Sequence, residues 1–299
     1  EAAIAAARRT FPSWSMTTPA ERGEVLRTIL EVYEARAADM AEAISTEMGA
    51  PIDMALSDQA GAGRSHLKAF IRALDAFEWQ RPMRPGKEGQ DLVFEAAGVA
   101  GLITPWNWPM NQVVLKVGAA LAAGCTMVLK PSEIAPMSSI LFAEIMHEAG
   151  VPAGVFNMVN GDGPGVGTIL SSHPDIDVVS FTGSTRAGIL ISKAAADTVK
   201  TVSLELGGKS PNLVFNDTDI DAAVARGASF CFANTGQSCN AATRMLVERD
   251  AYERAVGVAA ATAEATVVDL PSKSGGHIGP LVSQVQFDKV QSLIQTGIG

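Results

Sequence analysis

The sequence predicts an α/β protein built around a doubly wound parallel sheet, and two observations support this. Short apolar segments alternate with amphipathic helical segments from residue 97 to residue 208, and such alternation predicts right-handed crossovers between parallel strands. The short segments are almost continuously apolar, as strands that are covered on both faces require.

The first part of the chain, residues 1–78, has a helical pattern. Apolar residues recur at helical spacing through 21–44, and Thr18-Pro19 before them is a helix start signal. A second helical run covers about 52–78. Residues 79–98 are rich in proline and glycine and contain a short alternating piece, so we expect an arm or hairpin outside the main core.

The strands of the sheet are expected where apolar segments follow turn residues. These segments are 97–104, 125–130, 155–160, 177–183 and 201–208. Helices are expected between them, at 111–124, 136–150, 164–172 and 184–197. Because ligands of such sheets bind beyond the carboxyl ends of the strands, the residues at these ends are the first candidates for a site.

Composition excludes several classes of protein. The chain has 299 residues and a formal net charge of -9, without a block of Lys or Arg, so we expect neither nucleic acid nor an anionic membrane as a partner. The longest apolar stretch, 117–129, is too short to span a bilayer. Three cysteines and four scattered histidines favour neither a disulfide framework nor a metal site. These features, with no signal-peptide pattern, predict a cytoplasmic protein.

Two strand ends carry polar side chains in rigid turns. The first runs into TPWNWP (104–109), where two prolines and two tryptophans surround Asn107. This is either a packed turn or a donor aimed at an oxyanion, which is typically worth roughly 3 kcal/mol of barrier. The second ends in KPSE, where Lys130 and Glu133 are either surface residues or partners for ribose hydroxyls. An acidic side chain there would repel a ribose phosphate and so favours NAD over NADP.

Three later turns are weaker signals on their own. GDGPGVG (161–167) does not match the dinucleotide fingerprint and predicts only a close-approach turn. FTGSTRAG (181–188) starts a helix whose first N–H groups suit either an ordinary cap or a pyrophosphate. ELGGKSP places Glu205 before two glycines, as a solvated carboxylate or, in a partly apolar pocket, as a general base with a raised pKa.

The segment SFCFANTGQSCNAATRM (229–245) places small and polar residues on both sides of Cys239. Most free cysteines are inert small apolar residues, and Cys125 in a strand and Cys231 in a helical stretch fit that description. Cys239 instead follows a helix within Gly-Gln-Ser-Cys-Asn. A nucleophilic thiolate needs partial exposure and a favourable field, and this local sequence permits both.

The motifs TPWNWP, KPSE, FTGSTRAG, ELGGKSP and NTGQSC, in this order, resemble those of the aldehyde dehydrogenase superfamily, in its NAD(P)-dependent, hydrolytic type with a cysteine nucleophile. The resemblance covers essentially the whole chain. It implies that the Cys239 thiolate attacks an aldehyde and that Asn107 and the Cys239 N–H hold the oxyanion of the thiohemiacetal. A hydride then passes to NAD, and Glu205 activates the water that hydrolyses the resulting thioester.

The resemblance also implies a cofactor site and a domain organisation. Lys130 and Glu133 would bind the adenosine ribose and Ser184 the pyrophosphate. The other implied cofactor residues are Ile103, Thr104, Trp106, Gly163, Gly167, Gly183, Gly188 and Leu206. The NAD-binding domain would comprise 1–77 and 97–206, followed by a catalytic domain from 207 to 299. Residues 78–96 would form an oligomerisation arm, and a homodimer or homotetramer is expected for the complete protein.

One departure from the family pattern leaves alternatives open. Members of the family continue beyond residue 299 with a Glu-x-x-Phe-Gly-Pro segment and the rest of the catalytic domain, so an inactive fragment is one alternative. A cofactor-independent thiol esterase would use Cys239, Asn107 and Glu205 but would leave KPSE and FTGSTRAG without a role. A non-catalytic relative would lack the nucleophile or the base, and a CoA-acylating relative would lack Glu205.

Overall fold

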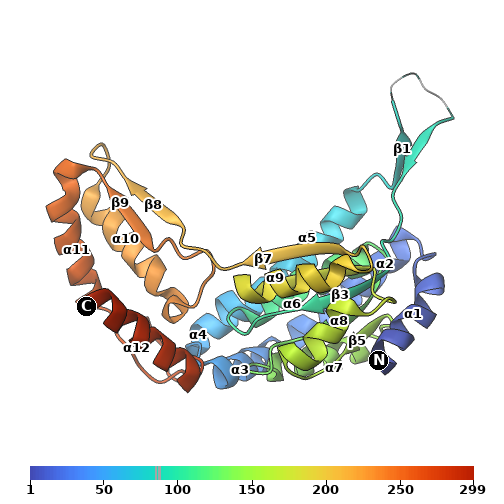
Figure 1. Ribbon diagram of the computed structural model, residues 1–299, viewed down its shortest axis with the longest axis horizontal. Helices are drawn as coiled ribbons and strands as arrows, with labels where there is room; N and C mark the ends of the chain where they lie inside the picture. The colour runs from blue at the N-terminus through green and yellow to red at the C-terminus, as the bar shows by residue number, and fades with distance from the viewer. Residues whose placement is uncertain (85, 87–88) are drawn as a thin grey trace.

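The computed structural model describes residues 1–84, 86 and 89–299 of the chain. Figure 1 shows a large α/β body, a two-stranded hairpin that projects from one end of it, and a smaller unit of helices and strands at the other end. Residues 85, 87 and 88 of the predicted arm lie outside the described residues.

The predicted helical region at the start of the chain consists of several helices. They are α1 (Ala2–Trp14), α2 (Pro19–Ala35), α3 (Ala37–Met48), α4 (Ile52–Met54), the π-helix η1 (Ala55–Ala60) and α5 (Gly61–Ala76). The predicted start at Thr18 is confirmed, because its side chain and that of Glu21 form a reciprocal capping box on α2. The run 21–44 is divided at Arg36, whose backbone leaves the helical region between α2 and α3.

The main sheet has five parallel strands in the order β5-β4-β3-β6-β7. They are β3 (Val99–Ile103), β4 (Thr126–Lys130), β5 (Phe156–Met158), β6 (Val178–Gly183) and β7 (Thr201–Leu206). The order runs outward from β3 in both directions, so the chain reverses between β3 and β6. The doubly wound parallel sheet is therefore confirmed, with its switch point between these two strands.

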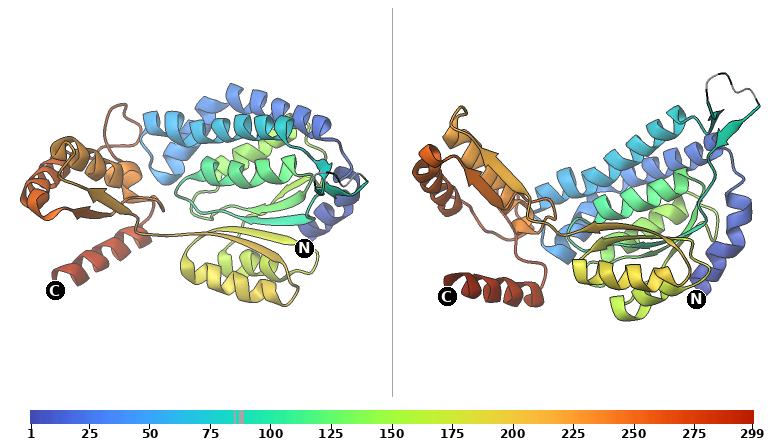
Figure 2. Two further views of the ribbon diagram at one scale, coloured as in Figure 1. Left: turned by 90° about the horizontal axis from the view of Figure 1, so that it is seen from above. Right: turned by 45° about the horizontal axis from the view of Figure 1, so that its top comes forward.

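Helices cover both faces of the sheet because alternate strand residues point to opposite sides. On one face Ala100 and Leu102 of β3 belong to a core shared with α2, α3, α5, α6 (Pro109–Ala122) and α7 (Met137–Glu148). On the other face Val99 and Ile103 pack with α1, α8 (Thr168–Ser172) and α9 (Thr185–Ala196). The two layers of helices are visible on either side of the sheet in Figure 2.

The predicted connecting helices are all present, with one difference at 164–172. That segment consists of a π-helical turn, η2 (Gly163–Gly167), followed by the short helix α8. Asp162 caps the turn by accepting from the N–H of Gly165 at 2.8 Å. The glycine-rich stretch 163–167 is therefore helical and leads directly into α8, and it does not form an open loop.

The arm expected around 79–98 contains an antiparallel hairpin of β1 (Gln80–Pro82) and β2 (Asp91–Val93). Aromatic contacts hold its base, where the Phe77 ring lies 4.8 Å from that of Trp79 and 5.0 Å from that of Phe94, centroid to centroid. The guanidinium of Arg22 lies over the Trp79 ring at 4.9 Å. The hairpin itself is exposed and projects from the body.

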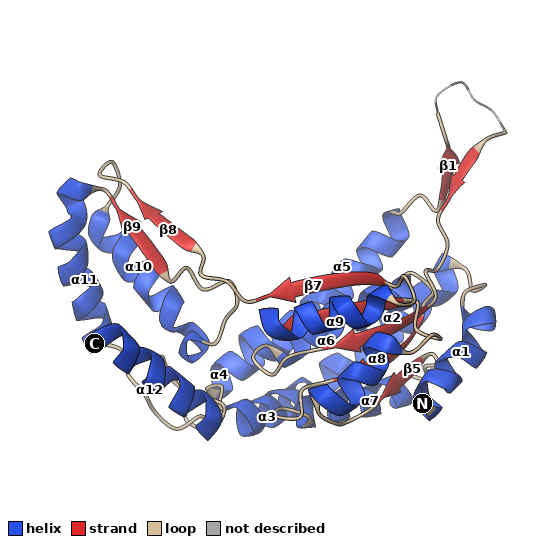
Figure 3. Ribbon diagram, viewed as in Figure 1, coloured by secondary structure: helices blue, strands red, loops and turns tan. Residues whose placement is uncertain are grey.

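The last part of the chain forms a second, smaller α/β layer (Figure 3). It contains β8 (Pro211–Val214), α10 (Ile220–Phe232), η3 (Ala233–Gly236), β9 (Arg244–Val247), η4 (Arg249–Ala251), α11 (Tyr252–Glu264) and α12 (Gln284–Ile298). Strands β8 and β9 pair in parallel, and Val214, Val224 and Ala255 lie in a small core under them. Leu213 and Leu246 of this pair are each more than half exposed.

Among the described residues, no helix combines the length and the apolar character needed to cross a membrane.

Candidate active site

The carboxyl ends of the central strands lie at one edge of the sheet. Ile103 at the end of β3 is in register with Lys130 at the end of β4 and with Phe181 of β6. Thr182 of β6 is in register with Glu205 of β7. Parallel pairing therefore brings the KPSE, FTGSTRAG and ELGGKSP turns to the same edge as the TPWNWP turn.

Asn107 lies in the turn between β3 and α6, and its side chain is half-buried. Its Nδ2 donates to the backbone carbonyl of Gln237 at 2.8 Å. The indole N–H of neighbouring Trp108 donates to the hydroxyl of Ser238 at 2.9 Å. The turn predicted to carry the oxyanion donor is thus bonded directly to the residues that precede Cys239.

The segment before Cys239 has an unusual backbone. Asn234, Thr235 and Gly236 are three successive residues in the left-handed region, with φ of 52°, 57° and 72°. For the β-branched Thr235 this conformation is strained. The three residues reverse the chain after α10 and direct Gln237, Ser238 and Cys239 toward the end of the sheet.

The three cysteines differ as expected from the sequence. Cys239 is exposed. Cys125 is buried, and its burial raises the pKa of the thiol. Cys231 is half-buried, burial raises its thiol pKa as well, and its Sγ donates to the carbonyl of Ala242 at 3.0 Å. Cys239 is therefore the thiol that is accessible to a reagent or a substrate.

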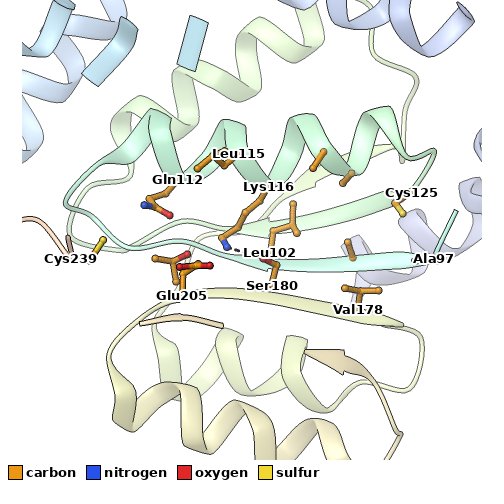
Figure 4. Close-up of a pocket in the computed structure, with 14 residues that line it drawn as sticks. Ala97, Leu102, Gln112, Leu115, Lys116, Cys125, Val178, Ser180, Glu205 and Cys239 are labelled. Carbon is orange, nitrogen blue, oxygen red and sulfur yellow. Dashed lines mark hydrogen bonds between the residues drawn. The ribbon is translucent and has the colours of Figure 1, made fainter. Parts of the chain in front are cut away.

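Cys239 lies between two cavities. One, of about 490 Å³, is walled by α6 and by strands β3, β6 and β7, and Glu205 and Lys116 line it together with Cys239. Figure 4 shows Cys239 and Glu205 at one end of this cavity and Cys125 and Ala97 at the other. The second, of about 530 Å³, is lined by Trp108, Asn111 and Phe230 among others. Glu205 lines a largely apolar cavity, although its side chain is exposed.

Lys116 is a basic residue that lines this cavity together with Glu205. It projects from α6, and its Nζ donates to the hydroxyl of Ser180 on β6 at 2.8 Å (Figure 4). Burial lowers the pKa of Lys116 to about 8, against a smaller opposing effect of the Glu205 charge. The ammonium can therefore release or take up a proton near pH 8 in the cavity that Glu205 and Cys239 also line.

Lys130 and Glu133 form an ion pair at the end of β4. Lys130 is buried, and its Nζ lies 2.9 Å from Glu133 Oε2 and donates to the carbonyl of Pro131 at 2.9 Å. Partial burial of Glu133 favours the neutral acid, but the hydrogen bond and charge of Lys130 outweigh it and lower the pKa of Glu133. Half of the Glu133 side chain remains exposed, so a carboxylate is available to a ligand at this strand end.

Ser184 is the N-cap of α9, where its hydroxyl accepts from the N–H of Ala187 at 3.3 Å. Gly188 lies in the first turn of this helix and faces β7, where a Cβ would stand 2.9 Å from the Leu206 side chain. That glycine lets the helix approach the strand closely. Gly183 is the last residue of β6. Gly163 and Gly167 lie on the separate turn before α8, and a Cβ added at either of them would meet no atom within 4 Å.

The polar atoms at the switch point fit a dinucleotide. The hydroxyls of Thr104 and Thr182, at the ends of β3 and β6, are buried and have no hydrogen-bond partner among the described residues. Buried polar groups normally have partners, so these two are suited to a ligand that arrives at the strand ends. Trp106 and Leu206 are half-buried on either side of the same edge.

Sequence reasoning did not find three residues that the structure places here, which are Lys116, Gln59 and Asn234. A lone lysine inside the apolar run QVVLKVGAAL was a usable signal for Lys116. No local signal marks Gln59, because the π-helix sets which side of the chain it occupies. Within the described residues no group of His, Cys, Asp or Glu is arranged to hold a metal ion.

The fold and this cluster define a class of protein, namely a doubly wound α/β scaffold with an exposed cysteine at the ends of its strands. The family model described as the aldehyde dehydrogenase family matches residues 1–299. The chain belongs to the aldehyde dehydrogenase family, and the resemblance seen in the sequence motifs is confirmed.

Relatives with known names or structures support this assignment. The chain is 50% identical over 297 residues to a 3-succinoylsemialdehyde-pyridine dehydrogenase from a Pseudomonas species, covering 99% of this chain and 61% of the relative. It is 58% identical to an aldehyde dehydrogenase of Bartonella henselae, whose crystal structure matches with a TM-score of 0.97 over 99% of this chain and 62% of that one.

A third relative was crystallised with ligands. It is a cysteine-to-alanine variant of aldehyde dehydrogenase C from Pseudomonas syringae in complex with NAD+ and octanal, which matches with a TM-score of 0.96 and 46% identity over 99% of this chain and 60% of that one. The chain thus spans about three fifths of the length of the relatives that it matches.

Proposed function

We propose that the whole protein oxidises an aldehyde to a carboxylic acid with NAD as the hydride acceptor, and that Cys239 is its nucleophile. The observation that carries this proposal is the position of Cys239, which is exposed and lines both the cavity that contains Glu205 and Lys116 and the one lined by Trp108 and Asn111. A thiol between two cavities can receive an aldehyde from one side and water from the other.

The first half of the reaction would form a bond between Cys239 Sγ and the aldehyde carbon. Asn107 Nδ2 carries two hydrogens and gives one to Gln237, which leaves the second for the developing oxyanion. The N–H of Cys239 would be the second donor. One such donor is typically worth roughly a hundredfold or more in rate. NAD, when bound, supplies the acceptor for the hydride that leaves the thiohemiacetal carbon.

The second half of the reaction would be hydrolysis of the thioester on Cys239. Glu205 would take a proton from a water molecule in the shared cavity, and the hydroxide equivalent would attack the thioester carbon. The Cys239 thiolate would then leave and the acid would form. Lys116 could receive the proton from Glu205, because its lowered pKa makes the neutral amine accessible near pH 8.

For the cofactor, Lys130 and Glu133 would bind the adenosine ribose, and Ser184 with the first turn of α9 would bind the pyrophosphate. Glu133 would disfavour the extra phosphate of NADP. Residues at or near the ends of the strands would line the rest of the cofactor site. These are Ile103, Thr104, Trp106, Gly163, Gly167, Gly183, Gly188 and Leu206.

The proposed domains follow the sequence expectations. Residues 1–77 and 97–206 would bind the cofactor, and 207–299 would belong to the catalytic domain. The hairpin within 78–96 would serve oligomerisation, and a homodimer or homotetramer is proposed for the whole protein. The described strands of the hairpin are exposed, and aromatic contacts anchor its base, as would suit a contact element between subunits.

The substrate is proposed only as a small-molecule aldehyde. The names of the relatives refer to a pyridine semialdehyde, to octanal and, for a Staphylococcus aureus structure at 32% identity, to betaine aldehyde. These compounds share the aldehyde group and little else, so the panel of aldehydes described next is needed to identify the rest of the substrate.

The test is to incubate the protein with NAD and a panel of aliphatic, aromatic and semialdehyde substrates and to follow NADH formation. The Cys239→Ala variant is the control. NADH that forms with the unmodified protein and not with the variant supports the proposal and starts to identify the substrate.

A chain extended to the length of the relatives is needed if the 299 residues alone are silent. Turnover by the extended chain would show that further residues complete the site. Silence of the extended chain with every aldehyde of the panel would overturn the hydride-transfer proposal, and ester hydrolysis that is indifferent to NAD alongside that silence would favour the thiol esterase.

A further inference from the structure

The side chain of Gln59 is fully buried beneath the turn that carries Asn107. Its Nε2 donates to the backbone carbonyl of Asn107 at 3.2 Å and lies 3.4 Å from Oδ1 of Asn234. The Sδ of Met48 is a third neighbour at 3.6 Å. One amide nitrogen thus contacts both the turn after β3 and the left-handed segment before Cys239.

The orientation of this amide is fixed by its neighbours. Both oxygens that face Nε2 are acceptors, so the opposite orientation would set Gln59 Oε1 against two other oxygens. In the observed orientation Oε1 is buried and has no partner among the described residues. A buried unpaired acceptor is unfavourable by about 1–3 kcal/mol.

The π-helix accounts for the position of Gln59. Residues 55–60 are wound more loosely than an α-helix, and the extra residue in this turn changes which side chain faces inward. Such π turns are frequent at functional sites. Here the turn directs a polar side chain into the core at the level of Asn107, between the apolar residues Ala55 and Ala60.

The contacts of Gln59 complete a network between the two segments. Asn234 Nδ2 also donates to the carbonyl of Asn107, at 2.8 Å, and Asn107 Nδ2 donates to the carbonyl of Gln237. The N–H of Gln237 donates to the carbonyl of Asn234 at 3.0 Å. Gln59 therefore bonds to the backbone carbonyl of Asn107, and the backbone carbonyl of Gln237 accepts from the Asn107 side-chain amide.

We propose that Gln59 is a positioning residue for the oxyanion site, because it fixes Asn107 relative to the segment that carries Cys239. This proposal rests on the proposed function of Asn107 and Cys239. It predicts that loss of the Gln59 amide slows reactions that pass through an oxyanion at Cys239. It also predicts that reactions of the thiol that form no oxyanion continue at nearly the same rate.

Two reagents separate these cases without turnover of an aldehyde. With p-nitrophenyl acetate the thiolate adds to the ester carbonyl, an oxyanion forms, and p-nitrophenolate leaves to give an acetyl thioester. With iodoacetamide the same thiolate displaces iodide from a saturated carbon, and no oxyanion forms. The ratio of the two rates at Cys239 therefore reports on the oxyanion site and cancels the reactivity of the thiol itself.

The experiment measures this ratio in the unmodified chain, in Gln59→Met and in Asn107→Ala. Gln59→Met keeps the volume of the side chain and removes its donor. We expect it to lower the ratio by about 10- to 100-fold, because a small displacement of a donor has effects of this size. The double variant Gln59→Met/Asn107→Ala is expected to have nearly the same rate ratio as Asn107→Ala alone, because both substitutions remove the same stabilisation of the oxyanion.

Tyr33→Phe is the matched control. The Tyr33 hydroxyl donates to the carbonyl of Ala60 at 2.8 Å and is as deeply buried as Gln59. Its removal deletes a hydrogen bond to the same π-helix without touching Asn107 or Asn234. An equal fall of the ratio in Tyr33→Phe, or a full additive effect of Gln59→Met on Asn107→Ala, would overturn the proposal.

The outcomes also distinguish this inference from the function on which it rests. An unchanged ratio in Asn107→Ala would remove the proposed oxyanion role and the inference with it. A lowered ratio in Asn107→Ala with an unchanged ratio in Gln59→Met would remove the inference alone.

A second variant tests the same point if Gln59→Met does not fold. In Gln59→Glu the protonated acid can still donate to the Asn107 carbonyl, whereas the carboxylate repels both oxygens. Burial raises the pKa of such a carboxyl, so the ratio is expected to fall as pH rises between about 6 and 9 in this variant only. A ratio that does not depend on pH in Gln59→Glu would contradict the role of the donor.

Discussion

Asn107 and Gln237 are 130 positions apart in the sequence, and the side chain of the first donates to the backbone carbonyl of the second at 2.8 Å. This bond joins the first strand of the sheet to the segment of the proposed nucleophile. Because that segment belongs to the last part of the chain, the geometry of the site depends on contact between two regions that have separate hydrophobic cores.

A neighbouring bond tests this connection. Trp108→Phe removes the 2.9 Å bond from the indole N–H to Ser238 while keeping most of the aromatic surface. Urea unfolding of Trp108→Phe, Ser238→Ala and the double variant is expected to give a coupling free energy of about 1 kcal/mol. Additive effects of the two substitutions would mean that the bond does not hold the segments together in solution.

The cysteines are expected to differ in reactivity. Iodoacetamide near pH 8 should label Cys239 at least about tenfold faster than the other two thiols, because the pKa values of Cys125 and Cys231 are raised by burial. Peptide mass mapping after short incubation measures the distribution of label. Cys231→Ser, which leaves Cys239 in place, is the control, and comparable labelling of Cys125 would contradict the buried position of that residue.

The lowered pKa of Lys116 makes the stability of the fold depend on pH. In the folded chain its pKa is about 8, and in the unfolded chain it has the ordinary value of 10.5. Between these values the unfolded state binds more protons, so the contribution of this group to stability rises with pH from about 8 to about 10.5. At neutral pH the buried charge is unfavourable, by roughly 3 kcal/mol at most.

Lys116→Met removes this dependence and keeps the length of the side chain. Its stability relative to the unmodified chain should therefore be greater at pH 7 than at pH 10, as measured by thermal unfolding. Lys68→Met is the control, since Lys68 pairs with Glu34 on the surface. The same relative stability of Lys116→Met at both pH values would show that the lysine keeps an ordinary pKa in the folded protein.

Position 98, directly before β3, requires glycine. Gly98 has φ of 123°, and a Cβ there would lie 2.1 Å from a carboxylate oxygen of Asp177. That oxygen accepts from the Val99 N–H and from Arg8, each at 2.7 Å. Gly98→Ala is expected to lower the free energy of unfolding by about 2–4 kcal/mol, through strain and displacement of Asp177.

Gly257→Ala is the control for this substitution. Gly257 lies inside α11 with open space around it, so alanine there should stabilise the chain by about 0.5–1 kcal/mol. Denaturant unfolding of both variants measures the difference. Equal and small effects would contradict the described contact between Gly98 and Asp177.

The sequence was sufficient to predict the sheet, and the reason is physical. Strands covered on both faces must be apolar, and turns with Gly, Pro, Ser and Thr mark their ends, so 99–103 and 126–130 could be located within a residue or two. The Thr18 capping box is equally local, because both of its partners lie within four residues.

The remaining features depend on contacts between distant segments. The division of 21–44 at Arg36 accompanies ion pairs of Arg36 with Asp39 and with Glu144 of α7, and the second of these partners cannot be read from the local pattern. Gln59 and Lys116 become part of the site only when the π-helix η1 and helix α6 pack beside the sheet ends. The roles of Cys239, Glu205 and Asn107 remain predictions, which the labelling and ester experiments address.

The left-handed run at Asn234, Thr235 and Gly236 has a consequence for engineering and for sequence variation. Replacement of Thr235 by glycine would relieve an unfavourable conformation, and this relief by itself favours the folded chain. The Thr235 hydroxyl also donates to the carbonyl of Gly279 at 2.9 Å, and glycine would free this part of the backbone. Stability and activity are thus expected to be in conflict at this position, as they often are where an active site stores strain.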